Sequence, residues 1–580
     1  MLKLVRFLKG YRLKTVFGPL FKLVEAVFEL IVPIVVAWMI DTAIPMGQNG
    51  NYSGLWKGGA ILVGLGIVGL AFALTAQYFA SRASLGFGTN LRKELYAHIN
   101  TFSYAELDKF STASLITRLT SDVNQAQQGV AMFIRLILRA PFIVIGAIIM
   151  TMTIDLQISL IFIATALIIG VILFIILSFT LPKYKDVQAK LDDVTRLTRE
   201  NLSGARVVRA FAAEEREKSG FAAASEVLTR TSTRVGAFSA LLNPLTYAIL
   251  NLGIIALLYF GGIKVNAGEL TQGEVIALVN YMTQILNALV VFANLLVTFT
   301  KASASAARIN EVFAVQSSMK EGAGAAADFS APAIVAKDVS FTYGNSSAPA
   351  ISDINISLEK GQTLGVLGST GSGKSTLISL LTRLYDATEG EIKIFGNDIK
   401  DYSPEQLSAL FGVVPQSAVL FGGTIRENLQ WRKPDATDED IDNALKISQS
   451  AEFVYAKDGG LDAPVAQGGK NFSGGQRQRL TIARALVGSP EILVLDDSSS
   501  ALDFATDAKL RKALTEEARS RGLTVINVSQ RAAGLKYCDK IVVMDDGKIV
   551  GYGKHDKLYN ECEVYREICD SQDKGGAANA

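Results

Sequence analysis

The chain has 580 residues, of which 49% are hydrophobic and 19% are charged, and its formal net charge is +2. It is longer than one typical domain of about 100–200 residues, and it is poorer in charge than average soluble domains, which carry about 25%. The small net charge gives no global signal for nucleic acid, so we expect no nucleic-acid partner. The apolar runs come first, and charged, glycine-punctuated sequence follows them.

Six apolar stretches in the first 300 residues are each long enough to cross a bilayer, which needs about 20 residues of helix. One such stretch could be a buried helix of a soluble protein, but six favour a membrane domain. The basic start, MLKLVRFLKG, is followed by no small-residue cleavage site, so we interpret it as a lead-in to the first membrane helix. We predict membrane helices near 15–40, 58–80, 132–153, 158–181, 241–263 and 275–298.

The loops between these helices predict the orientation of the chain. Lysine and arginine gather in the long connections after the second and fourth helices, whereas short connections such as IKVNAGELTQG carry few. Positive charge marks the cytoplasmic side, so both termini and both long loops of this multi-pass cell-membrane protein are expected in the cytoplasm. Apolar positions recur at helical spacing in the long loops, for example in LITRLTSDVNQAQQGV, which predicts long cytoplasmic helical extensions.

Charged residues interrupt two of the predicted membrane helices. Glu25 and Glu29 are one turn apart in the first helix, and Arg135 and Arg139 are one turn apart in the third. Charges inside a bilayer are costly and point to function by default. Three interpretations stay open: an ion pair between the helices, arginines that reach the lipid headgroups, or a substrate cavity. The sixth helix carries a polar and aromatic mixture that could line a cavity: Asn280, Tyr281, Gln284, Asn287, Phe292 and Asn294.

A phosphate-binding loop lies in the second half of the chain, where GSTGSGKST matches GxxxxGK[ST]. An apolar strand, TLGVL, is expected before it and a helix, LISLLTRLY, after it, as the motif requires. Glycines let backbone N–H groups turn towards phosphates, and the helix N-terminus adds positive potential. Lys374 would reach the β and γ phosphates, and Ser375 would hold Mg²⁺. The predicted loop residues are Gly368, Ser369, Thr370, Gly371, Ser372, Gly373, Lys374, Ser375 and Thr376.

A second motif supplies carboxylates. The apolar run ILVL predicts a buried strand that ends in Asp496 and Asp497. Open α/β sheets bind ligands at the carboxyl ends of their strands, so Asp496 suits a Mg²⁺ shell. The two motifs together predict an α/β P-loop domain that binds a nucleotide. A phosphate loop alone is equally compatible with a kinase, a GTPase or a helicase.

The sequence NFSGGQRQR, which lies between these motifs, resembles the signature of the ATP-binding cassette (ABC) family. Six predicted membrane helices before one cassette resemble an exporter-type half-transporter with the type I exporter fold, so the resemblance spans the full chain. We expect a transmembrane domain over 1–315, an Ala-, Gly- and Ser-rich linker over 316–331, a cassette over 332–570 and a disordered tail over 571–580.

The resemblance implies roles for further residues. Tyr343 in VSFTYG matches the aromatic residue that stacks on adenine, and Gln416 matches the lid glutamine that touches Mg²⁺ and water. The loop Ser500–Asp503 resembles the one that crosses to a second cassette, with Asp503 as its predicted site residue. The implied metal ligands are Ser375, Gln416 and Asp496. The residues that would close on ATP held by the second cassette are Ser473, Gly474, Gly475 and Gln476.

Two positions depart from the family pattern. Asp497 stands where the family has the glutamate that polarises water, and Gln530 stands where it usually has a histidine that contacts the γ-phosphate. A general base must come within about 2.6–3.2 Å of its proton, and aspartate is one methylene shorter than glutamate. The resemblance to bacterial heterodimeric exporters implies a degenerate site that binds ATP and hydrolyses it slowly. The alternative is neutral change in a fully active site.

The expected function is that of one subunit of an ATP-driven exporter for amphipathic compounds, with drugs as cargo by family analogy. The chain has one cassette, so a second half-transporter is the expected partner, and GARVVRAFAAEE resembles the loop that docks on the partner's cassette. A heterodimer is predicted and a homodimer is the alternative. Lipid or peptide export and an ATP-gated channel or regulator are the alternative functions. The other expected partners are the lipid bilayer and a small amphipathic substrate, and ATP and Mg²⁺ are the expected cofactors.

Overall fold

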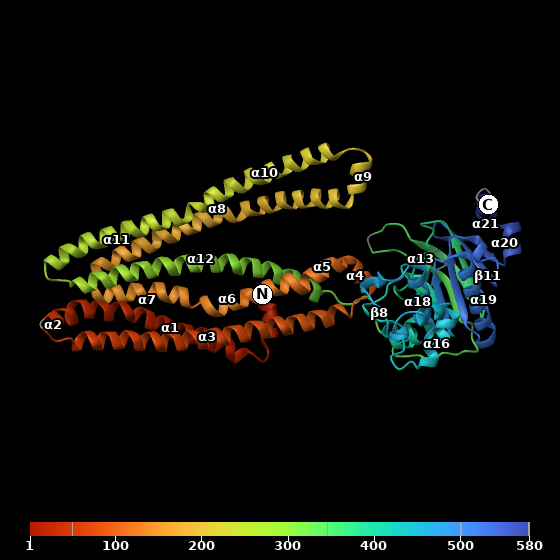
Figure 1. Ribbon diagram of the computed structural model, residues 1–580, viewed down its shortest axis with the longest axis horizontal. Helices are drawn as coiled ribbons and strands as arrows, with labels where there is room; N and C mark the ends of the chain where they lie inside the picture. The colour runs from red at the N-terminus through yellow and green to blue at the C-terminus, as the bar shows by residue number, and fades with distance from the viewer. Residues whose placement is uncertain (49, 345, 499–501, 578–580) are drawn as a thin grey trace. The chain divides into compact units, whose positions relative to one another are not determined.

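The structure of the protein, a computed structural model, describes residues 1–48, 50–344, 346–498 and 502–577. The chain forms two compact units. The membrane unit comprises Met1–Asn100 and Thr112–Val315, and the cassette unit comprises Thr101–Ser111 and Gln316–Ala580. Figure 1 shows the first as a bundle of long helices and the second as sheets covered by helices.

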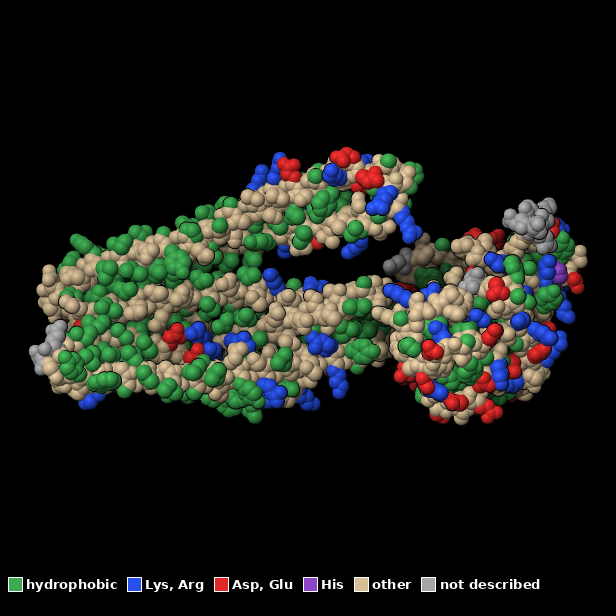
Figure 2. All heavy atoms as spheres, viewed as in Figure 1, with side chains coloured by type: hydrophobic (Ala, Val, Ile, Leu, Met, Phe, Trp, Pro, Cys, Tyr) green, Lys and Arg blue, Asp and Glu red, His purple; other side chains and the backbone are tan. Residues whose placement is uncertain are grey.

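The membrane unit contains six helical spans that are long and apolar enough to cross a membrane, as the sequence predicts. Much of the surface that Figure 2 shows over these helices is apolar, which suits contact with lipid. The spans are Arg12–Gly47, Ser53–Ile99, Thr112–Ile154, Leu156–Ser203, Glu214–Asn266 and Gln272–Ala314. The individual helices are α1 (Arg12–Trp38), α2 (Ile44–Gln48), α3 (Ser53–Ile99), α5 (Thr112–Thr117), α6 (Val123–Leu136), α7 (Arg139–Ile154), α8 (Leu156–Ser203), α9 (Ala205–Ala210), α10 (Glu214–Ala240), α11 (Leu242–Asn266) and α12 (Gln272–Ala314).

The long connections between the predicted membrane helices are helical. Helix α8 continues for 48 residues, and α10 packs against it and leads into α11. Figure 1 shows α8 and α10 side by side, joined at their far end by α9. This arrangement confirms the predicted helical extensions, which arise because apolar residues recur at helical spacing beyond the hydrophobic spans.

The third span departs from a continuous helix. Helix α6 ends at Leu136 and α7 begins at Arg139, so two residues outside the helices separate them. The sequence predicts a helix over 132–153, and Pro141 within it accounts for the interruption, because proline has no N–H to donate to the carbonyl oxygen of Ile137. The two arginines that the sequence places one turn apart therefore lie on two helices, on opposite sides of the break.

The core of the membrane unit contains a residue that the sequence assigns to a possible cavity lining. Tyr281 on α12 is fully buried, and its hydroxyl donates a hydrogen bond to the carbonyl oxygen of Leu30 on α1 over 2.6 Å. Its ring packs among apolar side chains of the helix bundle. The expectation of cavity lining is therefore wrong for Tyr281, because buried aromatic surface and a satisfied hydroxyl make it a core residue.

The cassette unit is built on two main sheets. The six-stranded sheet has the order β12-β11-β3-β10-β9-β6, with parallel pairing from β11 to β6 and an antiparallel edge strand β12. Its strands are β3 (Thr363–Gly368), β6 (Phe411–Val414), β9 (Ile492–Asp496), β10 (Thr524–Ser529), β11 (Lys540–Asp545) and β12 (Lys548–Gly553). The other sheets comprise β1 (Ile334–Phe341), β2 (Ile351–Leu358), β4 (Glu389–Ile394) and β5 (Asn397–Asp398), and the pair β7 (Gly423–Thr424) and β8 (Pro464–Val465).

Helices cover the parallel sheet, whose central strands are almost wholly buried. Strands of this kind read as continuous apolar runs, which is why TLGVL and ILVL were recognisable in the sequence. The helices of the cassette unit are α4 (Tyr104–Phe110), α13 (Lys374–Leu381), α14 (Pro404–Leu410), α15 (Ile425–Leu429), α16 (Asp438–Ile447), α17 (Ala451–Tyr455), α18 (Gly474–Leu486), α19 (Phe504–Arg521), α20 (His555–Glu561) and α21 (Glu563–Ala577).

The end of the chain differs from the predicted disordered tail over 571–580. Helix α21 continues to Ala577, and residues 578–580 lie outside the described part of the chain. Tyr565 and Cys569 bury one face of this helix against the sheet. The tail was predicted from its composition, because few apolar residues follow residue 570. Composition does not show that the amphipathic helix that begins before the tail continues into it.

Candidate nucleotide-binding site

Three neighbouring strands of the parallel sheet deliver the predicted site residues to one edge. The loop Gly368–Gly373 follows β3, Gln530 follows β10, and Asp496 ends β9. In the sheet register Leu367 lies beside Ser529, and Val528 lies beside Asp496. Since parallel strands end at the same edge, residues far apart in sequence meet there.

The phosphate loop has a shape that only glycine allows at its turn into α13. Gly373 is the N-cap of this helix and has φ +95°. A Cβ at this position would lie 2.6 Å from Cγ2 of Ile351, which excludes any larger residue. The first N–H groups of α13 consequently point towards the space above the loop, where a helix N-terminus favours negative charge.

Lys374 follows at the start of α13 with its side chain folded over the loop. Its Nζ donates hydrogen bonds to the carbonyl oxygens of Gly368, over 2.9 Å, and Ser369, over 2.6 Å. Burial lowers the pKa of Lys374, while the carboxylates of Asp497 and Asp496 oppose that shift. The hydroxyl of Ser372 is buried without a hydrogen-bond partner. A buried cation and an unpaired donor in one loop are suited to binding an anion.

The two aspartates are held at the end of β9. Burial raises the pKa of Asp496, and the neighbouring charge of Asp497 adds to the shift. Burial also raises the pKa of Asp497, against which Lys374, Arg531 and a hydrogen bond from the side chain of Gln416 act. Asp497 has a left-handed backbone with φ +45°, which aspartate tolerates better than most residues.

A cavity of about 370 Å³ joins these groups, and most of the predicted loop residues lie on its wall. Gly368, Ser369 and Ser372 are not part of its lining. The hairpin turn between β11 and β12 and the residues before β2 also line it, although the sequence did not predict them as site residues. The turn residues Asp546 and Gly547 carry a recognisable hairpin signal, but only the pairing of β11 with β3 places them here. The lining residues are Pro349, Ala350, Thr370, Gly371, Gly373, Lys374, Ser375, Thr376, Gln416, Asp496, Asp497, Gln530, Asp546 and Gly547.

The donor set on the cavity wall fits Mg²⁺. Ser375, Gln416 and Asp496, the predicted metal ligands, all line the cavity. The described residues include no group of three or more histidines, cysteines, aspartates and glutamates that could hold a metal alone. Mg²⁺ is usually bound through one or two carboxylates together with substrate phosphates. These residues would therefore share the ion with a nucleotide, and the ion would neutralise charge on the phosphates.

Tyr343, the predicted adenine-stacking residue, lies beside the cavity and is 38% exposed. Its hydroxyl is 3.1 Å from that of Thr376 in α13. The edges of Phe341 and Tyr385 meet its ring, at centroid distances of 4.8 and 5.5 Å. These contacts fix the ring while leaving aromatic surface available for stacking on a base.

The signature residues do not line this cavity. Ser473 is the N-cap of α18, where its Oγ accepts from the N–H of Gln476 and the side-chain oxygen of Gln476 accepts from the N–H of Ser473. Ser473 and Gly474 are exposed, and a Cβ at Gly474 would meet no atom within 4 Å. Within its own cassette, therefore, this helix N-terminus faces open space and binds nothing in the cavity.

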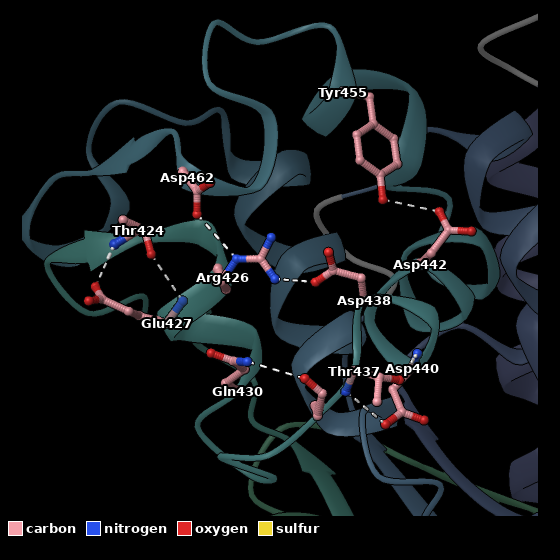
Figure 3. A network of polar contacts seen from close by, with 11 residues as sticks. Thr424, Arg426, Glu427, Gln430, Thr437, Asp438, Asp440, Asp442, Tyr455 and Asp462 are labelled. Carbon is pink, nitrogen blue, oxygen red and sulfur yellow. Dashed lines mark hydrogen bonds and ion pairs between the residues drawn. The ribbon is translucent and has the colours of Figure 1, made fainter.

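The segment after Gln416 is tied to the helical part of the cassette. Arg426 on α15 forms ion pairs with Asp438 and, over 3.2 Å, with Asp462 (Figure 3). Both carboxylates raise the pKa of Arg426. Capping boxes at Thr424 and Thr437 begin α15 and α16. The polar network in Figure 3 thus fixes the position of the short helix that follows the lid glutamine.

The remaining predicted residues lie at the ends of other elements. Asp503 is the N-cap of α19, and its carboxylate accepts from the N–H and the hydroxyl of Thr506. Ser500, in the predicted crossing loop, lies outside the described residues. Gln530 is exposed and lines the cavity, and its carbonyl oxygen accepts a hydrogen bond from Gln572 on α21. The sequence offered no signal for Gln572, which lies in the predicted tail.

Six membrane-spanning helices and a P-loop cassette define a membrane protein that binds nucleotide. Residues 15–289 match the ABC transporter transmembrane region, and residues 351–500 match the family model described as ABC transporter. The chain belongs to the ABC transporter family, whose cassette binds ATP and couples its hydrolysis to transport.

Relatives match the chain over nearly its whole length. An uncharacterized ABC transporter ATP-binding protein of Mycobacterium tuberculosis is 36% identical, with 97% of each chain covered. One of Bacillus subtilis is 34% identical, covering 99% of this chain and 98% of the relative. An ATP-dependent lipid A-core flippase of Vibrio vulnificus is 28% identical over 87% of each chain. A solved bacterial Atm1-family ABC exporter with ATP bound shares the fold, with 22% identity, a TM-score of 0.78 and 98% of each chain covered.

Proposed function

We propose that the chain is one subunit of an ATP-driven exporter in which two cassettes hold ATP between them. The observation that carries the proposal is the position of the signature helix. The exposed N-terminus of α18 is built to bind an anion, yet it lies outside the wall of the chain's own nucleotide cavity. A second cassette would present its phosphates to Ser473 and Gly474, and the phosphate loop of this chain would receive the partner's signature in return.

A second surface supports the same assembly. Helix α9 connects α8 and α10 and buries none of its residues. Val207 on α9 is 60% exposed, and Phe211, which directly follows the helix, is 80% exposed. Apolar side chains held outwards on a short connecting helix suit docking on another chain. We propose that this loop, GARVVRAFAAEE, lies on the partner's cassette and transmits its movement to the membrane helices.

We further propose that the partner is a different chain and that this chain's own site is degenerate. Asp497 and Gln530 line the cavity at the positions of the family's glutamate and histidine. The carboxylate of Asp497 is one methylene shorter than glutamate, and the side chain of Gln416 already donates to it. A misplacement of about 1 Å can cost roughly 10²-fold in rate. Binding of ATP depends on Lys374, Asp496 and the loop amides, which are all present.

The cargo is proposed to be an amphipathic compound that enters from the cytoplasm or the inner leaflet, with both termini and the cassette in the cytoplasm. Drugs are one such class. The Vibrio relative named as a lipid A-core flippase supports a lipid as the alternative within the same class. Hydrolysis, mainly at the partner's site, would reset the membrane helices after the cargo has left.

The test is uphill transport. The full chain with its partner, in inside-out vesicles, should accumulate a fluorescent amphipathic dye against its gradient when ATP is added. Gly474→Phe should abolish accumulation, because the side chain enters the space reserved for the partner's nucleotide. Gly236→Phe is the matched control, since a Cβ at Gly236, on a helix of the membrane unit, also meets nothing within 4 Å. Equilibration without accumulation would instead indicate an ATP-gated channel.

A further inference from the structure

Charged side chains gather in the membrane unit, and the nucleotide chemistry does not use them. Figure 2 shows acidic and basic side chains together within an otherwise apolar stretch of this unit. We call the following residues of α1, α6 and α7 the membrane charge cluster: Lys22, Glu25, Glu29, Arg135 and Arg139. Charges at such positions are costly unless they are paired or face a water-filled cavity.

Both carboxylates of the membrane charge cluster already have a cation. Nη2 of Arg139 lies 2.6 Å from Oε2 of Glu29, which joins α7 to α1. Nζ of Lys22 lies 2.5 Å from Oε2 of Glu25, one turn away on the same helix. The interhelical ion pair that the sequence left open is therefore present for Glu29 and Arg139. Three cations face two carboxylates, which leaves one positive charge in excess.

Arg135 is the cation without a carboxylate. Nη2 of Arg135 donates to the hydroxyl of Ser81 over 3.2 Å, and Nε of Arg135 is buried without a hydrogen-bond partner. Among the described residues, no carboxylate oxygen lies within 4.0 Å of its guanidinium. Nε of Arg139 and Oε1 of Gln284 on α12 are also buried and unpaired. Polar atoms that are removed from water without partners are expensive, so the site is incomplete as it stands.

The third span is interrupted at the same place. Arg135 lies in the last turn of α6, Arg139 is the first residue of α7, and the break between them lies within the third spanning helix. Interrupted helix within a bilayer is tolerated where it is buried in protein or lines a water-filled cavity. Pro141 explains this interruption, and Ile137 and Leu138 keep a right-handed helical backbone, so the polar site rests on the buried, unpaired Nε of Arg135 and on the lack of a carboxylate beside it in the described part of the chain.

We propose that the membrane charge cluster recognises the anionic headgroup, a phosphate or carboxylate, of an amphipathic cargo. Arg135 would bind the headgroup with its free N–H donors, because a planar guanidinium matches such oxygens with two parallel hydrogen bonds. Glu25 and Glu29 neutralise Lys22 and Arg139, so the charge of Arg135 stays in excess for the headgroup, and the apolar surface of the neighbouring helices would contact the hydrocarbon part. This inference rests on the proposed exporter function and narrows its cargo to anionic amphipaths.

The test measures binding without ATP, on the full chain with its partner in a nonionic detergent. The probes are a lysophosphatidic acid with a fluorescent acyl chain and a lysophosphatidylcholine with the same chain, and inorganic phosphate serves as a competitor. We expect the phosphate monoester to bind at least about tenfold more tightly than the choline ester, since a charge-assisted hydrogen bond corresponds to roughly 10–100-fold in affinity. Inorganic phosphate at millimolar concentration should compete weakly, because it lacks an acyl chain.

Substitutions of Arg135 test whether this residue causes the preference for the phosphate monoester. Arg135→Gln should weaken binding of the phosphate monoester by roughly tenfold or more and change the affinity for the choline ester by no more than about twofold. Arg135→Lys should keep part of the preference, since it retains the charge but not the planar fork. Arg234→Gln, at an exposed position of α10, is the control and should change neither affinity. Unchanged thermal unfolding and ATP affinity would verify that the variants are folded.

The outcomes separate this inference from the exporter proposal. Equal affinity for the two lipids, or equal loss of both in Arg135→Gln, would overturn the headgroup site even if the vesicles transport dye. Strong competition by inorganic phosphate would overturn an amphipathic ligand in favour of a free anion. Selective, Arg135-dependent binding without uphill transport would support the site and contradict the exporter function.

Discussion

The side chain of Gln572 holds the backbone at Gln530. Its Nε2 donates to the carbonyl oxygen of Gln530 over 2.8 Å, and its Oε1 accepts from the N–H of Ala532 over 2.9 Å. Gln530 lines the nucleotide cavity at the position of the family's histidine, and Gln572 lies on α21 near the end of the chain. The C-terminal helix thus fixes the loop that presents Gln530.

Gln572→Ala should loosen this loop. Two neutral hydrogen bonds, each worth about 0.5–1.5 kcal/mol, are lost, while Tyr565 and Cys569 keep α21 docked. We expect the amide of Ala532 to exchange with solvent at least several-fold faster, as measured by hydrogen exchange and mass spectrometry. Ser571→Ala, which changes the neighbouring exposed residue, should leave that exchange unchanged. Identical protection in both variants would mean that the loop is held by other contacts.

Lys374→Ala should weaken binding of ATP at this chain's site. The ammonium is the buried cation of the phosphate loop, and a hydrogen bond to a charged group contributes about 1.5–3 kcal/mol, which is roughly 10–100-fold in affinity. Equilibrium binding of a fluorescent ATP analogue to the purified dimer measures the change. Steady-state hydrolysis should fall less than binding, because the partner's site performs most of it. Unaltered affinity for ATP would contradict the assignment of this loop as the phosphate-binding loop.

Asp497→Ala should barely change the steady-state ATPase rate of the dimer, whereas removal of the partner's catalytic base should reduce it by about 10²–10⁴-fold. The reason is that Asp497 is too short to serve as an efficient base. Single-turnover analysis should also find ATP persisting in this chain's site after the other site has turned over. Equal losses from the two substitutions would favour a homodimer with an aspartate base.

Restoring the family's residues at these two positions should increase the rate of hydrolysis at this chain's own site. Asp497→Glu combined with Gln530→His restores the family's base and its histidine at two residues that line the cavity. We expect turnover at this site to rise at least about tenfold, which is the lower part of what a general base contributes. Asp497→Asn with Gln530→His is the control without a base and should show no rise. If the glutamate variant stays slow, the site is limited by something other than these two side chains.

Ser473→Trp should suppress most ATPase activity of the dimer while the isolated cassette fold is kept. Ser473 is exposed, and its substitution removes one N-cap, at a cost of about 0.5–2 kcal/mol. Ser403→Trp is a matched control, because Ser403 is also the N-cap of a helix with a capping box. We expect similar small shifts in thermal unfolding for both variants and loss of hydrolysis only for Ser473→Trp. Retained activity would contradict a signature that acts on the partner's ATP.

The sequence by itself determined the features whose residues are contiguous. Six spans follow from the length of uninterrupted apolar helix, and the phosphate loop follows from nine adjacent residues, 368–376, between a strand and a helix. The apolar run before Asp496 identified a buried parallel strand. Each of these features depends on residues within one continuous segment, so it can be recognised from that segment's sequence alone.

The tertiary structure decided the relationships between segments. The pairing of β11 with β3 brings Asp546 to the phosphate loop, α21 brings Gln572 to Gln530, and the packing of α7 on α1 pairs Arg139 with Glu29. It also buries Tyr281 in the core. Composition and periodicity report only what one segment prefers, whereas these outcomes depend on which surfaces pack together and which polar groups find partners there.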